Sequence, residues 1–443
     1  MSLDLVIKGG RVVDGTGSDA RSADIGIRDG RIVEIGKISA RAARIVDADG
    51  ALVTPGFVDI HTHYDGQATW SSRLNPSSHH GVTTVVMGNC GVGFAPVRPN
   101  DHDLLVRLME GVEDIPGAAL HEGLSWKWES FPDYLDYLDA RHYDMDIGAQ
   151  LPHAALRVFV MGERGANRDP ATADDIAAMR QLTAQAIRAG ALGFSSSRTL
   201  NHRSSTGDPT PSLTAAREEL IGIGRGLRDA GRGVLEMISD FKDASEEFST
   251  LRAMSEAAGA PMTISLAQGI SSHGWKKLMG MIDTANRDGL NIKGQVAPRA
   301  IGILMGLGCT LNPFIRCPSY RPVAQLPLDE RVARLKDPVL RSKLLAEVPE
   351  AGGPALLLTD FSKMWVLSPS WDYEPGPEDT IAARAERVGV SPQAYALDAM
   401  LQDGGRQMLY SPFANYADFN LDCCREMILE KNTVMGLGDG GAH

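Results

Sequence analysis

Two patterns of apolar and polar positions divide the chain. Over the first fifty-odd residues, apolar and polar side chains alternate, notably at 5–8, 25–28 and 31–35. Alternation is typical of strands with one buried face. The pair Asp29-Gly30 between two such runs is a strong hairpin signal. We therefore expect residues 1–54 to form a small antiparallel β domain.

From residue 55 onward, short apolar runs alternate with helical segments, as in βαβ units. Helical segments are expected at 170–189, 215–230 and 245–258. The first has Pro170 and Gly190 where helix ends favour them. Eight strands separated by helices predict an α/β fold, a (β/α)8 TIM barrel over residues 55–443, with its chemistry at the carboxyl ends of the strands. The eight predicted strands are 57–60, 83–87, 146–151, 191–194, 233–238, 262–266, 291–297 and 433–437.

Two connections in this second region are longer than ordinary loops. Residues 96–143 contain two tryptophans and a predicted helix at 131–138, and residues 298–432 separate the seventh and eighth strands. Inserts on the catalytic face of a barrel can act as lids and specificity elements. They can equally mediate oligomer contacts, and the sequence leaves both alternatives open.

Composition narrows the class of partner. The 443 residues carry a formal net charge of −12, with acidic side chains dispersed along the chain. This balance argues against nucleic acid or an anionic membrane as a partner. No apolar run reaches membrane-spanning length and no secretory leader pattern opens the sequence, so we expect a cytoplasmic protein with a small-molecule substrate. Five scattered cysteines do not make a disulfide framework.

The candidate chemistry lies at the ends of three predicted strands. The first strand leads into His61-Thr62-His63, the second is followed by Cys90, and the last by Asp439. Alternate side chains of an extended segment point the same way, so two imidazoles spaced this way form half a metal site. Strands one, two and eight are neighbours in a closed barrel, which brings all four groups to one place. The alternatives are unrelated turn histidines, a buried thiol and a loop aspartate.

The motifs around these residues resemble a known family. The run GFVDIHTHYD, preceded by DLVIKGGRVVDGTG and DIGIRDGRIVEIG, resembles the opening of the amidohydrolase superfamily of metal-dependent hydrolases. The run GVTTVVMGNCG resembles the N-acyl-D-amino-acid deacylase (D-aminoacylase) branch, in which a cysteine after the second strand is a metal ligand. The resemblance implies a β-sandwich-like accessory domain that the N-terminus shares with a C-terminal part, and a zinc site including Cys90. It also implies that Asp439 both touches metal and acts as general base.

Two positions depart from that branch, whose members carry histidines at the ends of strands five and six. Aligned by eye, Glu236 stands in place of the first and Leu266 in place of the second. A carboxylate can ligate zinc and a leucine cannot. We therefore expect one zinc ion rather than two, centred on His61, His63 and Asp439, with Cys90 and Glu236 as further ligands.

Four residues after other strands are candidates for substrate binding. His153 follows strand three, Arg198 and His202 follow strand four, and Gln268 follows strand six. Arginine suits a substrate carboxylate because its guanidinium binds carboxylates in a bidentate manner. A buried structural histidine and a solvated loop arginine are the competing interpretations.

Together these features predict a metal-dependent amidohydrolase acting on a C–N bond. The resemblance implies an N-acyl-D-amino acid substrate, attacked by metal-activated water whose proton Asp439 accepts. Alternatives are another amide, a cyclic imide or a carbamate, or a catalytically silent scaffold. A homo-oligomer stays open. The sequence stops four residues after Asp439, without the C-terminal part implied by the resemblance, so we expect a longer native polypeptide.

Overall fold

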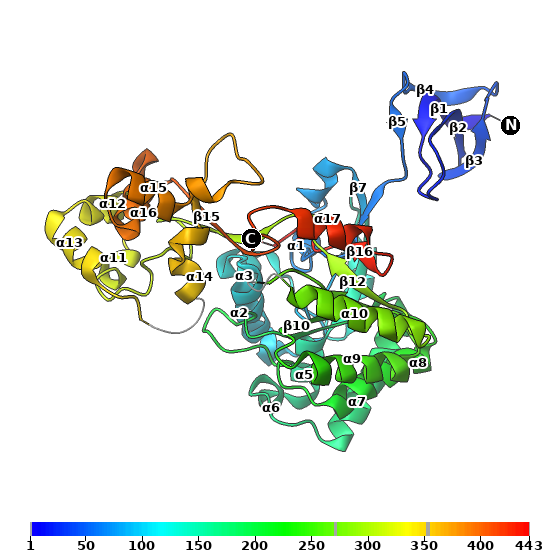
Figure 1. Ribbon diagram of the computed structural model, residues 1–443. Coiled ribbons are helices and arrows are strands. Elements are labelled where there is room, and N and C mark those ends of the chain that lie inside the picture. Colours follow the sequence, from blue (N-terminus) through cyan, green and yellow to red (C-terminus); the bar gives the residue numbers. More distant parts are fainter. Residues whose placement is uncertain (1, 270–272, 351–354, 443) are drawn as a thin grey trace.

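The centre of the molecule is a curled, all-parallel sheet of eight strands (Figure 1). The computed structural model describes residues 2–269, 273–350 and 355–442. Across the sheet the strands lie in the order β16-β12-β11-β10-β9-β8-β7-β6, which follows their order along the chain. Each of the eight predicted strands forms within a few residues of its expected bounds. They are β6 (Phe57–Asp59), β7 (Val82–Met87), β8 (Asp146–Pro152), β9 (Gly193–Arg198), β10 (Val234–Ser239), β11 (Met262–Ser265), β12 (Ile292–Val296) and β16 (Thr433–Met435).

The first and last strands of this sheet meet through the segments that follow them. Thr62 and Gly440 form a parallel bridge. The backbone N–H of Asp439 donates to the His61 carbonyl at 3.0 Å, and that of His63 donates to the Gly440 carbonyl at 2.7 Å. Gly438 allows this approach, because a Cβ there would lie 2.3 Å from a carboxylate oxygen of the residue that ends β6. Residues almost 380 positions apart are thus brought together.

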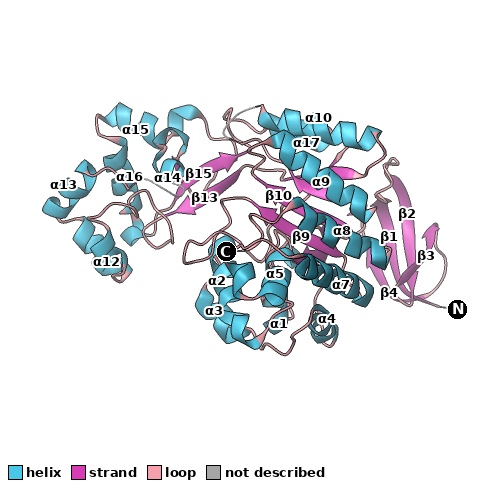
Figure 2. Cartoon of the chain, turned by 90° about the horizontal axis from the view of Figure 1, so that it is seen from below, coloured by secondary structure: helices cyan, strands magenta, loops and turns pink. Residues whose placement is uncertain are grey.

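Helices cover the outside of the sheet. The longest, α7, starts at Ala173 because Thr172 and Asp175 form a capping box, which places the start three residues after Pro170. Helices α7, α8 and α9 pack side by side (Figure 2). The helices outside the two long connections are α1 (Gln67–Trp70), α5 (His153–Met161), α6 (Glu163–Ala166), α7 (Ala173–Ala189), α8 (Arg217–Ala230), α9 (Ala244–Ala258), α10 (Gly274–Arg287) and α17 (Asp422–Leu429), with a 3-10 turn at Ser77–His80.

The N-terminal residues form a separate sheet that projects from the rest (Figure 1). It consists of β1 (Leu3–Val12), β2 (Arg21–Arg28), β3 (Arg31–Gly36), β4 (Ala42–Asp47) and β5 (Leu52–Val53). The predicted hairpin forms between β2 and β3, where Asp29 and Gly30 both have positive φ. The expectation of a purely antiparallel unit is wrong, because β4 and β5 pair with β1 in parallel. The second half of a sandwich and the domain boundary at residue 54 stay predictions.

Both long connections fold into helical inserts. The first contains 3-10 turn Pro99–Asp101, α2 (His102–Glu113), α3 (Gly117–Gly123) and α4 (Phe131–Asp139), the last as predicted. The second has its own apolar core and an antiparallel sheet of β13 (Ile301–Met305), β15 (Leu409–Ala414) and β14 (Trp365–Val366). Its helices are α11 (Arg321–Ala324), α12 (Leu328–Leu335), α13 (Pro338–Ala346), α14 (Ala355–Thr359), α15 (Ile381–Val388) and α16 (Pro392–Met400), with 3-10 turns at Phe361–Lys363, Pro377–Asp379 and Asp403–Gly405. Within the described residues, no helix has the length and apolarity needed to cross a membrane.

Candidate metal centre

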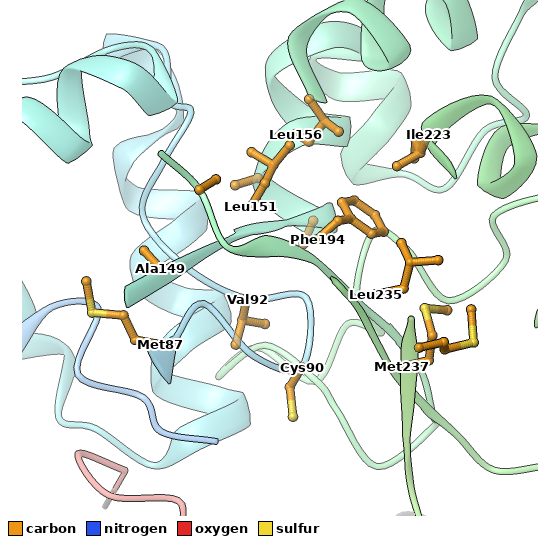
Figure 3. Close-up of a cluster of buried hydrophobic side chains, with 14 of the residues drawn as sticks. Met87, Cys90, Val92, Ala149, Leu151, Leu156, Phe194, Ile223, Leu235 and Met237 are labelled. Carbon is orange, nitrogen blue, oxygen red and sulfur yellow. The ribbon is translucent and has the colours of Figure 1, made fainter. Parts of the chain in front are cut away.

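Three buried side chains of types that can bind a metal ion converge where β6 and β7 end. His61, His63 and Cys90 each offer a ligand atom, and these atoms all lie within 4.8 Å of one another. The Cys90 Sγ lies 3.3 Å from His61 Nε2. Figure 3 shows the sulfur pointing away from the core side chains Phe194 and Leu235. Two imidazoles and a thiol at this separation match the donor types of a zinc site.

The turn that carries Cys90 is held in an uncommon conformation. Cys90 has φ 54°, in the left-handed region that non-glycine residues seldom adopt. Gly88, two residues earlier, passes so close to β8 that a Cβ would lie 2.2 Å from the Gln150 carbonyl oxygen. The Cys90 backbone N–H donates to Glu236 Oε2 at 3.0 Å. Glu236 therefore holds the cysteine turn in place, while its buried Oε1 has no hydrogen-bond partner among the described residues.

Asp439 faces both histidines from the segment that follows β16. Its Oδ1 lies 3.6 Å from His61 Nε2 and 3.7 Å from His63 Nε2. Arg299, which follows β12, approaches the other carboxylate oxygen at 3.5 Å and donates to the Leu437 carbonyl at 3.2 Å. The structure thus brings Asp439, the predicted general base, close to the two histidines. It also adds a cation that the sequence did not single out.

The far side of each histidine ring contacts a side chain from another element. His61 Nδ1 lies 2.9 Å from Gln295 Oε1, and the same amide donates from Nε2 to Thr263 Oγ1 at 2.9 Å. Since Gln295 Oε1 can only accept, His61 carries its proton on Nδ1 and turns the Nε2 lone pair to the centre. His63 Nδ1 instead lies 3.4 Å from Oε1 of Glu113, the last residue of α2.

Buried carboxylates crowd the centre. Burial raises the pKa of Glu236 to about 8, that of Glu113 to about 7 and that of Asp65 to about 6. Neighbouring carboxylates, including that of Asp439, add to the effect at Glu236 and Glu113, whereas His63 opposes it at all three carboxyl groups. A bound cation would oppose both contributions by favouring the ionised forms.

The two histidines respond to these surroundings differently. Burial lowers the pKa of His61 to about 4. Burial acts in the same direction on His63, but the carboxylates of Glu113 and Asp439 outweigh it and raise its pKa to about 9. Burial alone would raise the pKa of Asp439; the neighbouring histidines and Arg299 instead hold it well below its usual range. The centre therefore combines a neutral imidazole at His61, a positively charged imidazole at His63 and a negatively charged carboxylate at Asp439.

The residues present fit a divalent metal ion. Two imidazoles, a thiol and a carboxylate face one point, and Glu236 Oε1 is a buried acceptor with no partner among the described residues. An unpaired buried acceptor is costly unless something occupies the space it faces. Leu266, whose side chain cannot bind a metal ion, is buried and packs against Gly294 of β12. The ligand roles of His61, His63, Cys90, Asp439 and Glu236 stay predictions.

His153 belongs to a fully buried polar cluster. Its Nδ1 lies 2.8 Å from Ser196 Oγ, and its Nε2 lies 2.9 Å from Glu219 Oε1. Arg157 Nε donates to the same Glu219 oxygen at 2.9 Å. Both ring nitrogens of His153 are thus engaged by protein groups. This favours a structural role, and its predicted role in substrate binding stays untested.

Two other candidates are also engaged by neighbouring residues. Arg198 donates to Glu247 from Nε at 2.6 Å and to the Ala215 carbonyl at 2.6 Å. Gln268 donates to Asp418 Oδ2 at 2.8 Å and accepts from the Ala417 backbone at 3.0 Å, which ties the end of β11 to the second insert. These contacts leave little of either side chain for a ligand.

His202 is the substrate-binding candidate whose pKa is affected by the two histidines of the centre. Its Nδ1 contacts Ser197 Oγ at 2.9 Å. Its pKa is lowered to about 4, first by burial and then by His63 and His61. A neutral imidazole beside the metal-binding group can donate or accept a hydrogen bond. His443, the final residue of the run after β16, lies outside the described residues.

Sequence reasoning missed Glu113, Gln295 and Arg299. Glu113 and Arg299 sit in or at the edge of the long inserts, where the βαβ pattern assigns no position relative to the strands. Gln295 lies inside β12, beside Lys293 and Gly294, so it does not stand out as one polar residue in an apolar run. A glutamine in a parallel strand is still a usable signal, because both faces of such a strand are buried.

With this geometry in place, the comparisons identify the family. Residues 44–362 match the model of the Amidohydrolase family, and the chain belongs to that family. The D-aminoacylase of Alcaligenes xylosoxydans xylosoxydans is 36% identical over 229 residues, covering 52% of this chain and 43% of that protein. The N-acyl-D-glutamate deacylase of the same organism is 32% identical over 307 residues, covering 67% and 57%. The chain thus spans about half the length of these relatives.

Solved structures show the same fold. An N-acyl-D-glutamate deacylase from Bordetella bronchiseptica, complexed with zinc and a phosphonate inhibitor, has a TM-score of 0.62 and 23% identity. It matches over 98% of this chain and 76% of that chain. A D-aminoacylase mutant in complex with copper chloride has a TM-score of 0.61 and 24% identity, over 98% and 75%. The resemblance to the deacylase branch is confirmed.

Proposed function

We propose that this protein is a metal-dependent amidohydrolase that cleaves the amide bond of an N-acyl-D-amino acid or a similar small acylated amine. The observation that carries this proposal is the convergence of His61, His63 and Cys90 within 4.8 Å, with Asp439 facing both imidazoles. Membership of the Amidohydrolase family and similarity to the deacylases support the reaction class.

The proposed cofactor is one zinc ion. His61, His63 and Cys90 would hold it, with Asp439 and Glu236 beside them. When bound, such an ion polarises a carbonyl group and lowers the pKa of water. The closed (β/α)8 barrel implied by the sheet order, with the bridge between Thr62 and Gly440, belongs to the same proposal. A homo-oligomeric state remains a prediction.

The protein's own side chains have separate proposed tasks. Asp439 accepts the proton of the attacking water at a carboxylate oxygen and returns it to the leaving nitrogen. Arg299 holds that carboxylate in its ionised form from the solvent side, where its own side chain is 43% exposed. His202 would donate a hydrogen bond to the substrate. Glu236 keeps the Cys90 turn in its left-handed conformation.

Metal analysis combined with a substrate panel tests the proposal. We expect purified protein grown with zinc to hold about one ion per chain and to hydrolyse N-acetyl-D-amino acids faster than the L-isomers. His61→Asn should lose both zinc and turnover. His80→Asn, which removes an exposed histidine before β7, is the matched control and should keep both. Zinc-free, inactive wild-type protein would favour a silent scaffold, and turnover of a cyclic imide or carbamate alone would correct the substrate class.

A further inference from the structure

One of the buried carboxylates at the centre, that of Glu113, is not among the proposed metal ligands. Glu113 is 6% exposed and is the last residue of α2, in the first insert. A helix C-terminus carries partial negative charge, so a carboxylate there is unfavourable. Burial adds a desolvation cost. Both costs have to be offset by a specific partner, and the ion-pair partner in the structure is His63 at 3.4 Å.

His63 has a matching requirement. Its ring is buried, with Nε2 facing Asp439 and Nδ1 facing Glu113. At 3.4 Å the Nδ1 contact is longer than an ordinary hydrogen bond, and Nδ1 has no other hydrogen-bond partner among the described residues. In His61 the equivalent nitrogen has a hydrogen-bond partner, because the amide oxygen of Gln295 lies 2.9 Å from its Nδ1. The two histidines therefore have different far-side acceptors, one neutral and one carboxylate.

The helix that carries Glu113 is fixed in place by close backbone contacts. A Cβ at Gly111 would lie 2.3 Å from the Arg203 carbonyl oxygen, so α2 lies directly against the loop after β9. The Ser205 backbone also donates to the Arg107 carbonyl at 2.8 Å. Asp114, which ends the helix, accepts from Thr310 of the second insert at 3.0 Å. Both inserts thus set the position of the carboxylate.

We propose that Glu113 is a positioning residue that accepts the Nδ1 proton of His63 and so presents the Nε2 lone pair to the metal ion. The inference rests on the proposed metal site and deepens it. An imidazole bound to metal through one nitrogen is oriented by the acceptor of its other N–H, and that acceptor also fixes the tautomer. The first insert would then complete the centre rather than only cover it.

Zinc affinity of Glu113 variants tests the proposal. We expect Glu113→Ala to weaken zinc binding about 10–100-fold in competition with a chromophoric chelator. Glu113→Gln should recover most of the affinity, because its amide oxygen can still accept the Nδ1 proton. Asp103→Asn removes a carboxylate from the same helix at a 73% exposed position, and is expected to bind zinc as wild type does. Wild-type affinity in a folded Glu113→Ala variant would overturn the proposal.

A metal-free measurement separates this inference from the proposed function. In ¹⁵N-histidine NMR spectra of zinc-free protein, recorded above the His63 pKa of about 9 so that the ring is neutral, Nδ1 of His63 should carry the hydrogen. The His63 signals are assigned by their loss in His63→Gln. In Glu113→Ala the proton should move to Nε2, as in free imidazole. An unchanged Nδ1 signal in that variant would refute the role of Glu113. Wild-type protein that binds no zinc would refute the metal site, and the spectra would still decide the role of Glu113.

Discussion

Replacing Asp439 by asparagine isolates the proposed general base. The substitution keeps the size of the side chain and the oxygen that faces His61 and His63 at 3.6 and 3.7 Å. It removes the negative charge and the ability to take up a proton. The charge partner Arg299, at 3.5 Å, is 43% exposed and can be solvated, so the fold should survive.

The expected loss follows from the role assigned to the carboxylate. Loss of a general base typically slows a reaction about 10²–10⁴-fold. At about 1.36 kcal/mol per tenfold change, this raises the activation free energy by about 2.7–5.4 kcal/mol. Weaker metal binding would add to the loss, since Asp439 is also a proposed ligand. Both quantities must therefore be measured on the same preparation.

The assay is kcat and kcat/KM on an N-acetyl-D-amino acid, with zinc content and thermal melting determined in parallel. Asp439→Ala distinguishes the two roles, because it removes the ligand oxygen as well as the base. Asp139→Asn, at the exposed end of α4, is the control for a lost carboxylate. A well-folded, zinc-loaded Asp439→Asn variant with near-normal kcat would refute the assignment of this residue as the base.

Three further predictions concern a buried ion pair, the pH dependence of stability and backbone packing. Glu219→Gln leaves Arg157 charged and buried, so the free energy of unfolding should fall by about 3–5 kcal/mol in urea titrations; an unchanged midpoint would contradict the buried pair. The folded-state pKa of Glu219 and of His153 lies below the usual value. Wild-type stability should therefore fall as pH drops through about 6.5 and then about 4.3, and the second decline should shrink in Glu219→Gln. Gly438→Ala should lower activity and zinc content, because the new Cβ would lie 2.3 Å from a carboxylate oxygen. The control Gly280→Ala lies at an exposed position of α10 with nothing within 4 Å, so it should be neutral or stabilising. Equal behaviour of the two variants would contradict the close approach at Gly438.

Much of the fold was predictable because its signals are local. The eight parallel strands come from short apolar runs, and the hairpin between β2 and β3 comes from Asp29-Gly30. The start of α7 was misplaced by three residues because its capping box overrides the proline signal. The parallel pairing of β4 and β5 was missed, since alternation reports a buried face and not the direction of a neighbour.

The pairing of His61 with His63, and the positions of Cys90 and Asp439 after strands, follow from the order of residues alone. One-residue spacing in an extended segment directs two side chains to the same side, and strand ends of a parallel sheet share an edge. These rules hold whatever surrounds them, so the core of the metal site follows from the spacing of residues along the chain.

The side chains that support this group, and the candidates that are engaged elsewhere, became apparent from the three-dimensional packing. Gln295 contacts His61 across 234 residues of chain, and Glu113 reaches His63 from an insert. Arg198 pairs with Glu247 in a contact 49 residues apart. Such partners are selected by packing and by the cost of leaving buried polar groups unpaired, and neither depends on sequence neighbours. The spacing of residues thus placed these side chains, and the packing of distant elements set their orientation and charge.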